Sequence, residues 1–176
     1  MILCLGLPNS GKTLLLRSLS SYPKPIEKFD TVATVGINVA HLNHLNSNQP
    51  FTIREIGGQM RPIWNTYFNK SVSAILFTID CSNPVDIGPN VVTLIDIFRS
   101  LSAQSIKPKV LIILTKSDYI GPLKLREALD GLLLDELINS RLLDANSTKV
   151  IQCSSITGQG LNDIFEWLSN YDNKAT

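Results

Sequence analysis

The chain has 176 residues, of which 44% are apolar and 18% are charged, and these proportions are ordinary for a globular domain with one core. Its formal net charge is +1, so there is no electrostatic reason to expect binding to nucleic acid or to an anionic membrane surface. Its three cysteines, Cys4, Cys81 and Cys153, lie far apart in the sequence, which excludes a local metal-ligand cluster or disulfide framework and indicates a reducing compartment.

Short apolar runs alternate with segments of helical periodicity, which is typical of a βαβ architecture with a largely parallel sheet. The first half is predicted to contain a strand at Ile2–Leu5, a helix at Lys12–Ser20 and a loop at Tyr22–Asp30. A hairpin is then predicted, with strands at Ile37–Leu42 and Phe51–Ile56 around the polar turn Asn43–Pro50. In the second half, strands are predicted at Ser73–Ile79, Val110–Leu114 and Val150–Cys153. They alternate with helices at Val91–Leu101, Leu123–Ile138 and Leu161–Leu168.

We expect no membrane anchor in this sequence. No apolar run approaches the ~20 residues that a membrane span needs. Position 2 is Ile2, so N-myristoylation is not expected, and Asp172–Thr176 contains no prenylation box. The sequence therefore predicts one domain over residues 1–176, in a monomeric cytoplasmic protein.

The segment Gly6–Thr13 follows the first strand and opens the first helix. It matches the pattern G-x-x-x-x-G-K-[ST], and its position between a buried strand and a helix is the context that this motif requires. Backbone N–H groups of such a loop and the helix N-terminus attract phosphate, while Lys12 adds a charge and the Thr13 hydroxyl can bind Mg²⁺. The residues expected to hold the nucleotide phosphates are Gly6, Leu7, Pro8, Asn9, Ser10, Gly11, Lys12, Thr13 and Leu14.

A second motif, Thr115-Lys116-Ser117-Asp118, follows the strand Val110–Leu114. Ligands of open α/β sheets lie at the carboxyl ends of the strands, so this motif is expected to reach the same pocket. It resembles the guanine-specificity motif of small GTPases, and that resemblance implies that Asp118 accepts two hydrogen bonds from guanine and that the stem of Lys116 lies along the base. Adenine lacks this pair of donors and would leave the carboxylate unpaired. A helix-capping role is the alternative for Asp118.

Three more segments share features with one family: Thr31–Asn38 (T-V-A-T-V-G-I-N), Glu55–Gln59 (E-I-G-G-Q), and Arg61–Trp64 (R-P-I-W) followed by Tyr67 and Phe68. Together with the phosphate loop they resemble the ADP-ribosylation factor (Arf) and Arf-like small GTPases. The resemblance implies a P-loop G domain, an α/β fold whose six-stranded, mostly parallel sheet has one antiparallel strand and helices on both faces. It also implies binding of GTP, GDP and Mg²⁺.

The same resemblance assigns roles to individual residues. Thr34 would meet Mg²⁺ together with Thr13, and Gly58 would contact the γ-phosphate through its N–H. Gln59 would be the catalytic residue that positions the attacking water. Ser154 and Ser155, in the segment that follows the last strand, would complete the guanine contact.

Several residues depart from the family pattern. Glu55 stands in place of an aspartate; its carboxylate could reach the water shell of the metal, or its longer side chain could displace that shell. In addition, two residues of the family pattern are missing between Gln59 and Arg61. A charge, Arg54, replaces an aromatic residue of the triad with which Arf proteins bind effectors. These departures are most similar to the divergent branch known as Arf-like protein sixteen.

The family pattern leaves two roles open for each of three other residues. Pro8 either obstructs the γ-phosphate or is neutral, and Trp64 is either a core anchor or a partner contact. Arg61 is either a self-supplied arginine finger or a structural residue.

The resemblance predicts a GTP-dependent switch with slow hydrolysis, whose partners are an effector, an exchange factor and an activating protein. Family analogy suggests recruitment to membranes or cilia by such partners. The alternative is a nucleotide-stabilised interaction module that hardly hydrolyses GTP, like the β-subunit of the signal-recognition-particle receptor. A P-loop kinase would need an Arg-rich lid, which the sequence does not show.

Overall fold

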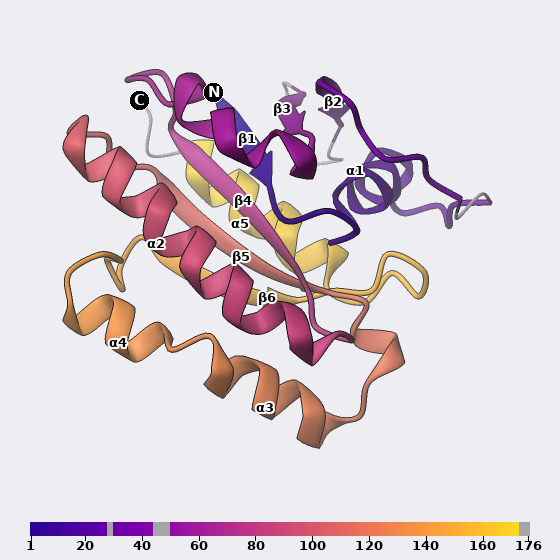
Figure 1. The fold of residues 1–176 in the computed structure, drawn as a ribbon. Coiled ribbons are helices and arrows are strands. Elements are labelled where there is room, and N and C mark those ends of the chain that lie inside the picture. The colour runs from indigo at the N-terminus through magenta and orange to yellow at the C-terminus, as the bar shows by residue number, and fades with distance from the viewer. Residues whose placement is uncertain (28–29, 44–49, 173–176) are drawn as a thin grey trace.

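The computed structural model describes residues 1–27, 30–43 and 50–172, and six strands in this part of the chain form one sheet (Figure 1). They are β1 (Ile2–Leu5), β2 (Ile37–Leu42), β3 (Phe51–Ile56), β4 (Ala74–Asp80), β5 (Lys109–Thr115) and β6 (Thr148–Gln152). Their order is β2-β3-β1-β4-β5-β6, and every neighbouring pair is parallel except β2 and β3. The predicted sheet is confirmed. Most of the predicted hairpin turn, residues 44–49, lies outside the described residues.

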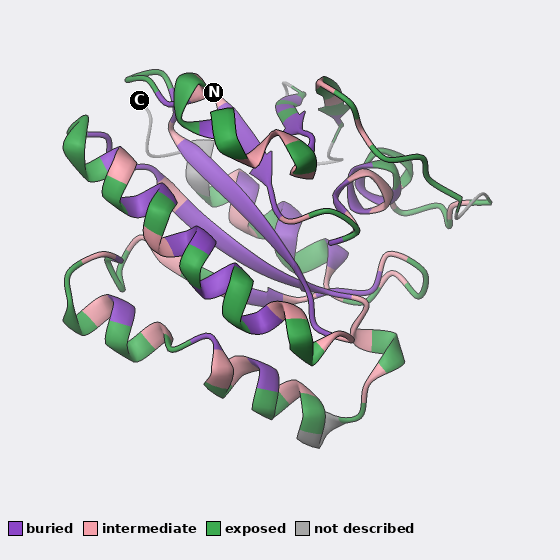
Figure 2. Ribbon diagram, viewed as in Figure 1, coloured by how far each residue is buried: buried purple, intermediate pink, exposed green. Residues whose placement is uncertain are grey.

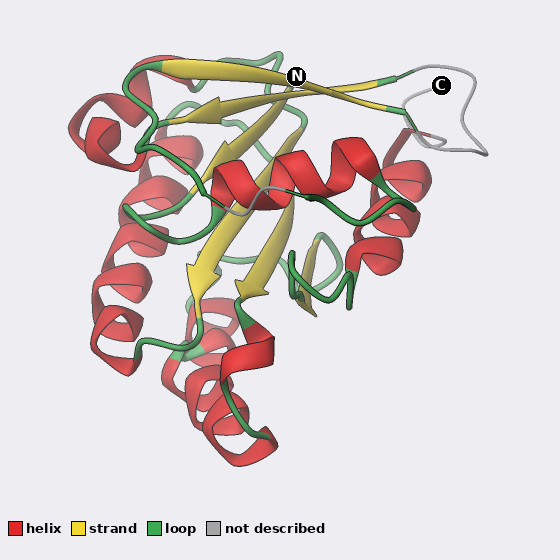
Figure 3. Ribbon diagram, turned by 90° about the vertical axis from the view of Figure 1, so that its right-hand side faces the viewer, coloured by secondary structure: helices red, strands yellow, loops and turns green. Residues whose placement is uncertain are grey.

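Helices cover both faces of the sheet, as predicted (Figures 1 and 3). Helices α1 (Lys12–Ser21) and α5 (Leu161–Asp172) pack on one face, and α2 (Ile87–Ala103), α3 (Pro122–Gly131) and α4 (Leu134–Asn139) pack on the other. Among the described residues, no helix combines the length and the apolar character needed to cross a bilayer.

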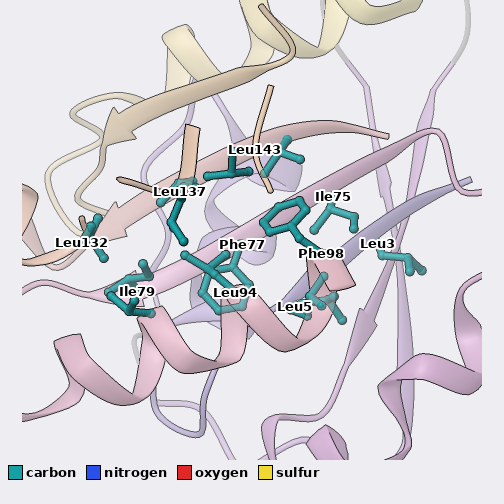
Figure 4. Packing of buried hydrophobic residues seen from close by; sticks show 14 of the residues in the cluster. Leu3, Leu5, Ile75, Phe77, Ile79, Leu94, Phe98, Leu132, Leu137 and Leu143 are labelled. Atoms are coloured by element: carbon teal, nitrogen blue, oxygen red, sulfur yellow. The ribbon is translucent and has the colours of Figure 1, made fainter. Parts of the chain in front are cut away.

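The core consists of two apolar layers, one on each face of the sheet. Strand β4 is buried along its whole length (Figure 2). Its alternate residues belong to opposite layers, because the side chains of a strand alternate between faces. Phe77 and Ile79 face the layer that contains Leu94 and Phe98 of α2 (Figure 4). The other layer joins Leu76 to α1 and α5. This packing fixes the strands on which the loops described below depend.

The prediction of one helix over Leu123–Ile138 is wrong. The segment forms α3 and α4, separated at Leu133, which has a φ of 51° and lies outside the right-handed helical region. The apolar spacing continues across the break, because Leu132 and Leu137 are both buried in the same layer. Periodicity alone therefore gave no sign of the break. The 3₁₀ segments η1 (Gly58–Tyr67), η2 (Pro84–Asp86) and η3 (Ser117–Tyr119) were also not predicted.

Five of the six strands run in the same direction, so their carboxyl ends meet at one edge of the sheet. The loops after β1, β3, β4, β5 and β6 leave from this edge. In open α/β sheets this edge is where ligands bind. The phosphate loop follows β1, the segment Glu55–Gln59 leaves the end of β3, and Thr115–Asp118 leaves the end of β5. The segment Thr31–Asn38 leads into β2, whose antiparallel direction brings its first residue to the same edge.

Candidate functional site

The phosphate loop connects β1 to α1 and is held from the neighbouring strands. The Ser10 and Thr78 hydroxyls lie 2.7 Å apart, which ties the loop to β4. The Thr115 hydroxyl lies 2.9 Å from the Ser10 carbonyl and 3.0 Å from the Ile79 carbonyl, so it ties the same loop to the end of β5. Gly11 caps α1 without a side-chain hydrogen bond. The first N–H groups of the helix therefore remain available to an anion.

The Lys12 side chain crosses this loop. Its ammonium group donates to the carbonyls of Gly6 and Leu7, both at 2.9 Å, and to the Ser10 hydroxyl at 3.2 Å. Burial lowers the pKa of Lys12, and the nearby Cys4 and Glu55 partly oppose that shift. A phosphate group in the loop would stabilise the charged form of this buried lysine.

Four side chains from three segments form an oxygen-rich cluster beside the loop. The Thr13 hydroxyl at the start of α1 donates to Oε1 of Glu55 at 2.5 Å, and the Thr34 hydroxyl donates to the same oxygen at 3.1 Å. The two hydroxyl oxygens are 3.0 Å apart. The amide of Asn38 donates to Oε2 of Glu55 at 3.2 Å. The structure thus brings together Thr13 and Thr34, the two predicted metal ligands.

The segments around Thr34 and Gly58 touch each other and the phosphate loop through their backbones. The Gly57 N–H donates to the Gly36 carbonyl at 3.0 Å. A Cβ atom at Gly57 would lie 2.3 Å from the Thr34 carbonyl oxygen, and one at Gly58 would lie 2.5 Å from the Pro8 nitrogen. No side chain fits at either position. Gln59, the predicted catalytic residue, follows directly and is exposed.

The R-P-I-W segment lies in η1, which packs against α2. Trp64 is buried, and its indole N–H donates to the Gly57 carbonyl at 3.1 Å, so it is a core anchor beneath this part of the site. Arg61 donates to Asp96 of α2 at 3.0 Å. Its guanidinium is thus engaged by the helix, which agrees with the structural role rather than with an arginine finger.

A cavity of about 260 Å³ lies at the ends of β5 and β6. Six of the predicted residues line it: Gly11, Leu14, Thr115, Lys116, Asp118 and Ser155. The remaining lining residues are Ser82, Tyr119 and Ile156. Asp118 is exposed within the described residues, so its carboxylate is accessible to a ligand rather than occupied as a buried cap. Because Gly11 and Leu14 line the cavity, it adjoins α1, the helix that starts in the phosphate loop.

Two residues of β4 that the sequence analysis missed hold segments of the site. Asp80, which ends β4, receives the Lys116 ammonium at 2.5 Å through Oδ2 and the N–H and hydroxyl of Ser82 through Oδ1. Thr78 contacts the phosphate loop as described above. A polar residue within or at the end of an otherwise apolar central strand was the signal that could have identified both.

The segment after β6 is organised by its own hydrogen bonds. The Ser154 side chain is fully buried and accepts from the N–H groups of Ile156 and Thr157. The carbonyl of Ser155 accepts from the Ser18 hydroxyl of α1 at 2.9 Å, and the N–H of Ser117 donates to the Cys153 carbonyl at 3.3 Å. Ser154 thus shapes the segment, while Ser155 lines the cavity.

The sequence model described as the ADP-ribosylation factor family matches residues 1–172. The chain belongs to the ADP-ribosylation factor family. It is 30% identical to ADP-ribosylation factor 1 of Brassica rapa subsp. pekinensis over 172 residues, an alignment that covers 96% of this chain and 86% of the relative. It is 31% identical over 175 residues to human ADP-ribosylation factor-like protein 16, covering 96% and 84% of the two chains.

Solved structures show the same fold. The Arl6 BBS3 small GTPase from Trypanosoma brucei, with a bound nucleotide analogue GppNp, matches with a TM-score of 0.74 and 22% identity over 99% of this chain and 98% of that chain. The mammalian SRP receptor structure matches with a TM-score of 0.77 and 21% identity over 97% and 98%. This protein is therefore a small GTPase with the P-loop fold, and the Arf family to which it belongs consists of GTP-binding switches.

Proposed function

We propose that this Arf-family protein binds GTP and GDP with Mg²⁺ through residues 1–176 acting as one G domain. The observation that carries the proposal is the convergence of three segments at one point: the loop before β2, the loop after β3 and the phosphate loop. A γ-phosphate bound there would contact all three segments, and its removal would release two of them.

The placement of these segments supports the following roles for individual residues. The phosphates are held by the loop Gly6–Leu14 with the Lys12 charge, and guanine is held by the cavity around Asp118. Thr13 and Thr34 hold Mg²⁺, which when bound neutralises charge on the β- and γ-phosphates. The donor set fits this ion, because hydroxyl and carboxylate oxygens are the ligands that Mg²⁺ prefers. Gln59 positions the attacking water.

The output of the switch is binding of protein partners. Apolar side chains near the nucleotide-sensitive segments are unusually exposed: Val32 is 87% and Val35 is 90% exposed, and Ile37, Val39 and Ile63 are also exposed. An effector that buries them would recognise the state in which Thr34 and Gly58 are held. An exchange factor and an activating protein would act on the same segments. By family analogy, a cytoplasmic protein would thereby be recruited to membranes or cilia.

A finer proposal concerns the branch of the family. We propose that the chain belongs to the branch of Arf-like protein 16. The 31% identity with the human protein supports it, as do the departures at Glu55 and Arg54. The 30% identity with a plant Arf is nearly the same and supports the family as a whole.

Base specificity tests the nucleotide assignment. We expect binding of guanine nucleotides to exceed that of adenine nucleotides by several orders of magnitude, because Asp118 would be left unpaired by adenine. Asp118→Asn should shift preference toward xanthine nucleotides, whose C2 carbonyl can accept from the new amide. Competition binding with GTP, ATP and XTP measures both effects, with exposed Asp130→Asn as the matched control. Equal affinity of the unmodified protein for ATP and GTP would refute the assignment.

The second candidate is a nucleotide-stabilised interaction module with little hydrolysis. Two observations favour it: Gly58 already lies against Pro8, and the Gln59 side chain is exposed. Single-turnover measurements separate the candidates. We expect intrinsic turnover at or below ~10⁻⁴ s⁻¹, little affected by Gln59→Leu, and stimulation by an activating protein that this substitution abolishes. An absence of stimulation by any activating protein of the family would favour the module.

A further inference from the structure

Glu55 is a carboxylate buried beside the phosphate loop. It lies on β3 with no exposed surface. Among the described residues, its hydrogen-bond donors are the hydroxyls of Thr13 and Thr34 and the amide of Asn38, and no lysine or arginine forms an ion pair with it. The nearby Lys12 ammonium donates to Gly6, Leu7 and Ser10 instead. A buried carboxylate is costly unless a positive charge compensates it, and here no cation contacts it directly.

Three oxygens of the cluster lie close enough together to share one ion. The Thr34 hydroxyl oxygen lies 3.0 Å from that of Thr13 and 3.1 Å from Oε1 of Glu55, and the Thr13 hydroxyl oxygen lies 2.5 Å from Oε1. Mg²⁺ binds oxygens octahedrally at about 2.1 Å, which places adjacent ligands about 3.0 Å apart. Two of the three separations match an edge of such a coordination shell, whereas the hydrogen-bonded Thr13 and Glu55 oxygens would have to move slightly apart to bind the same ion.

The second carboxylate oxygen is turned away from this face. Asn38 lies directly opposite Glu55 in the antiparallel pair of β2 and β3, and its amide donates to Oε2. Oε2 is thereby occupied, and Oε1 is left facing the two hydroxyls. This orientation suits a carboxylate that binds a metal through one oxygen.

We propose that Glu55 is itself a direct ligand of the bound Mg²⁺, through Oε1, so that the protein supplies three of the metal's oxygens rather than the two hydroxyls alone. The inference rests on the proposed function, because it presumes the nucleotide complex. An aspartate at this position would end short of the hydroxyls by up to one carbon–carbon bond, ~1.5 Å. A water molecule would fill that gap. In this chain the longer side chain occupies the position of that water.

The experiment uses the whole chain, labelled with ¹³C at the glutamate side-chain carboxyl carbons and loaded with Mn²⁺ and GppNp. Electron–nuclear double resonance then measures the coupling of these carbons to the metal. We expect the strong ¹³C coupling of a directly bound carboxylate, lost in Glu55→Asp and retained in the matched control Glu127→Asp, whose side chain is exposed on α3. In ¹⁷O-enriched water, Glu55→Asp should gain one metal-bound water over the wild type.

The wild-type spectrum decides the question even if a variant does not fold. Bound Mn²⁺ and GppNp without a strong ¹³C coupling would overturn the inference and leave the proposed function intact. Failure of the protein to retain GppNp would overturn both. A strong coupling that survives Glu55→Asp would assign the signal to another glutamate and likewise overturn the inference.

Discussion

Arg61 is the guanidinium nearest in sequence to Gln59, yet the structure directs it to Asp96 of α2 at 3.0 Å. Both side chains are substantially exposed, 37% and 58%, so the pair is screened by solvent and contributes little to stability. We expect Arg61→Ala to leave intrinsic GTP turnover unchanged and to alter the free energy of unfolding by less than about 1 kcal/mol. Single-turnover hydrolysis and urea denaturation measure the two effects. A hundredfold loss of turnover would restore the arginine-finger interpretation.

The buried polar residues around the site are constrained in a different way. The hydroxyls of Thr78 and Thr115 lie in the interior of the sheet and hold the phosphate loop from below. Both residues are buried, so each lost hydrogen bond would leave a buried carbonyl or hydroxyl unsatisfied. These positions determine the shape of the loop.

Helices α3 and α4 are joined at Leu133, whose left-handed conformation costs a side chain with a Cβ about 1–2 kcal/mol. Glycine adopts this conformation freely but loses more chain entropy on folding. We expect Leu133→Gly to be neutral or stabilising, whereas Arg126→Gly, at an exposed position inside α3, should destabilise by about 1 kcal/mol. Urea denaturation compares the two variants. Equal destabilisation by both would show that Leu133 is not strained.

The sequence predicted the elements whose signals are local. The phosphate loop and the Thr115–Asp118 motif follow buried strands with fixed spacing, and the structure places them together as expected. The break at Leu133 was missed because apolar periodicity runs through it. The contact of Asp80 with Lys116 was missed because it depends on the pairing of β4 with β5, which no local pattern encodes.

The cluster around Glu55 shows the same limit. The substitution for aspartate was visible in the sequence, but its consequence depends on the register of two strands. Asn38 faces Glu55 only because Ile37 pairs with Ile56 and the hairpin continues from there. A shift by one residue would place Asn38 on the opposite face of the sheet.

A nucleotide that binds only the folded molecule stabilises it by an amount set by its concentration relative to its Kd; at 100 times the Kd this adds about 2.7 kcal/mol to the free energy of unfolding. At equal nucleotide concentration, GppNp with Mg²⁺ should raise the Tm more than GDP with Mg²⁺, because contacts of the triphosphate with the segments around Thr34 and Gly58 lower its Kd. Thermal denaturation measures the difference, with ATP as the control. Equal shifts for GppNp and GDP would contradict the switch.

The two ends of the site differ in how firmly they are anchored. Around the base cavity, Lys116 is fixed to Asp80 at the end of the buried strand β4, and Ser117 is fixed to the buried Cys153 just after β6. On the metal side, residues 31–36 form no helix or strand, and their hydrogen bonds to the rest of the site are made by the Thr34 hydroxyl and the Gly36 carbonyl. Departure of a nucleotide should therefore start at its phosphate end, with the base leaving last. A chelator that removes the metal would shorten the residence time of the nucleotide without changing which base the protein selects.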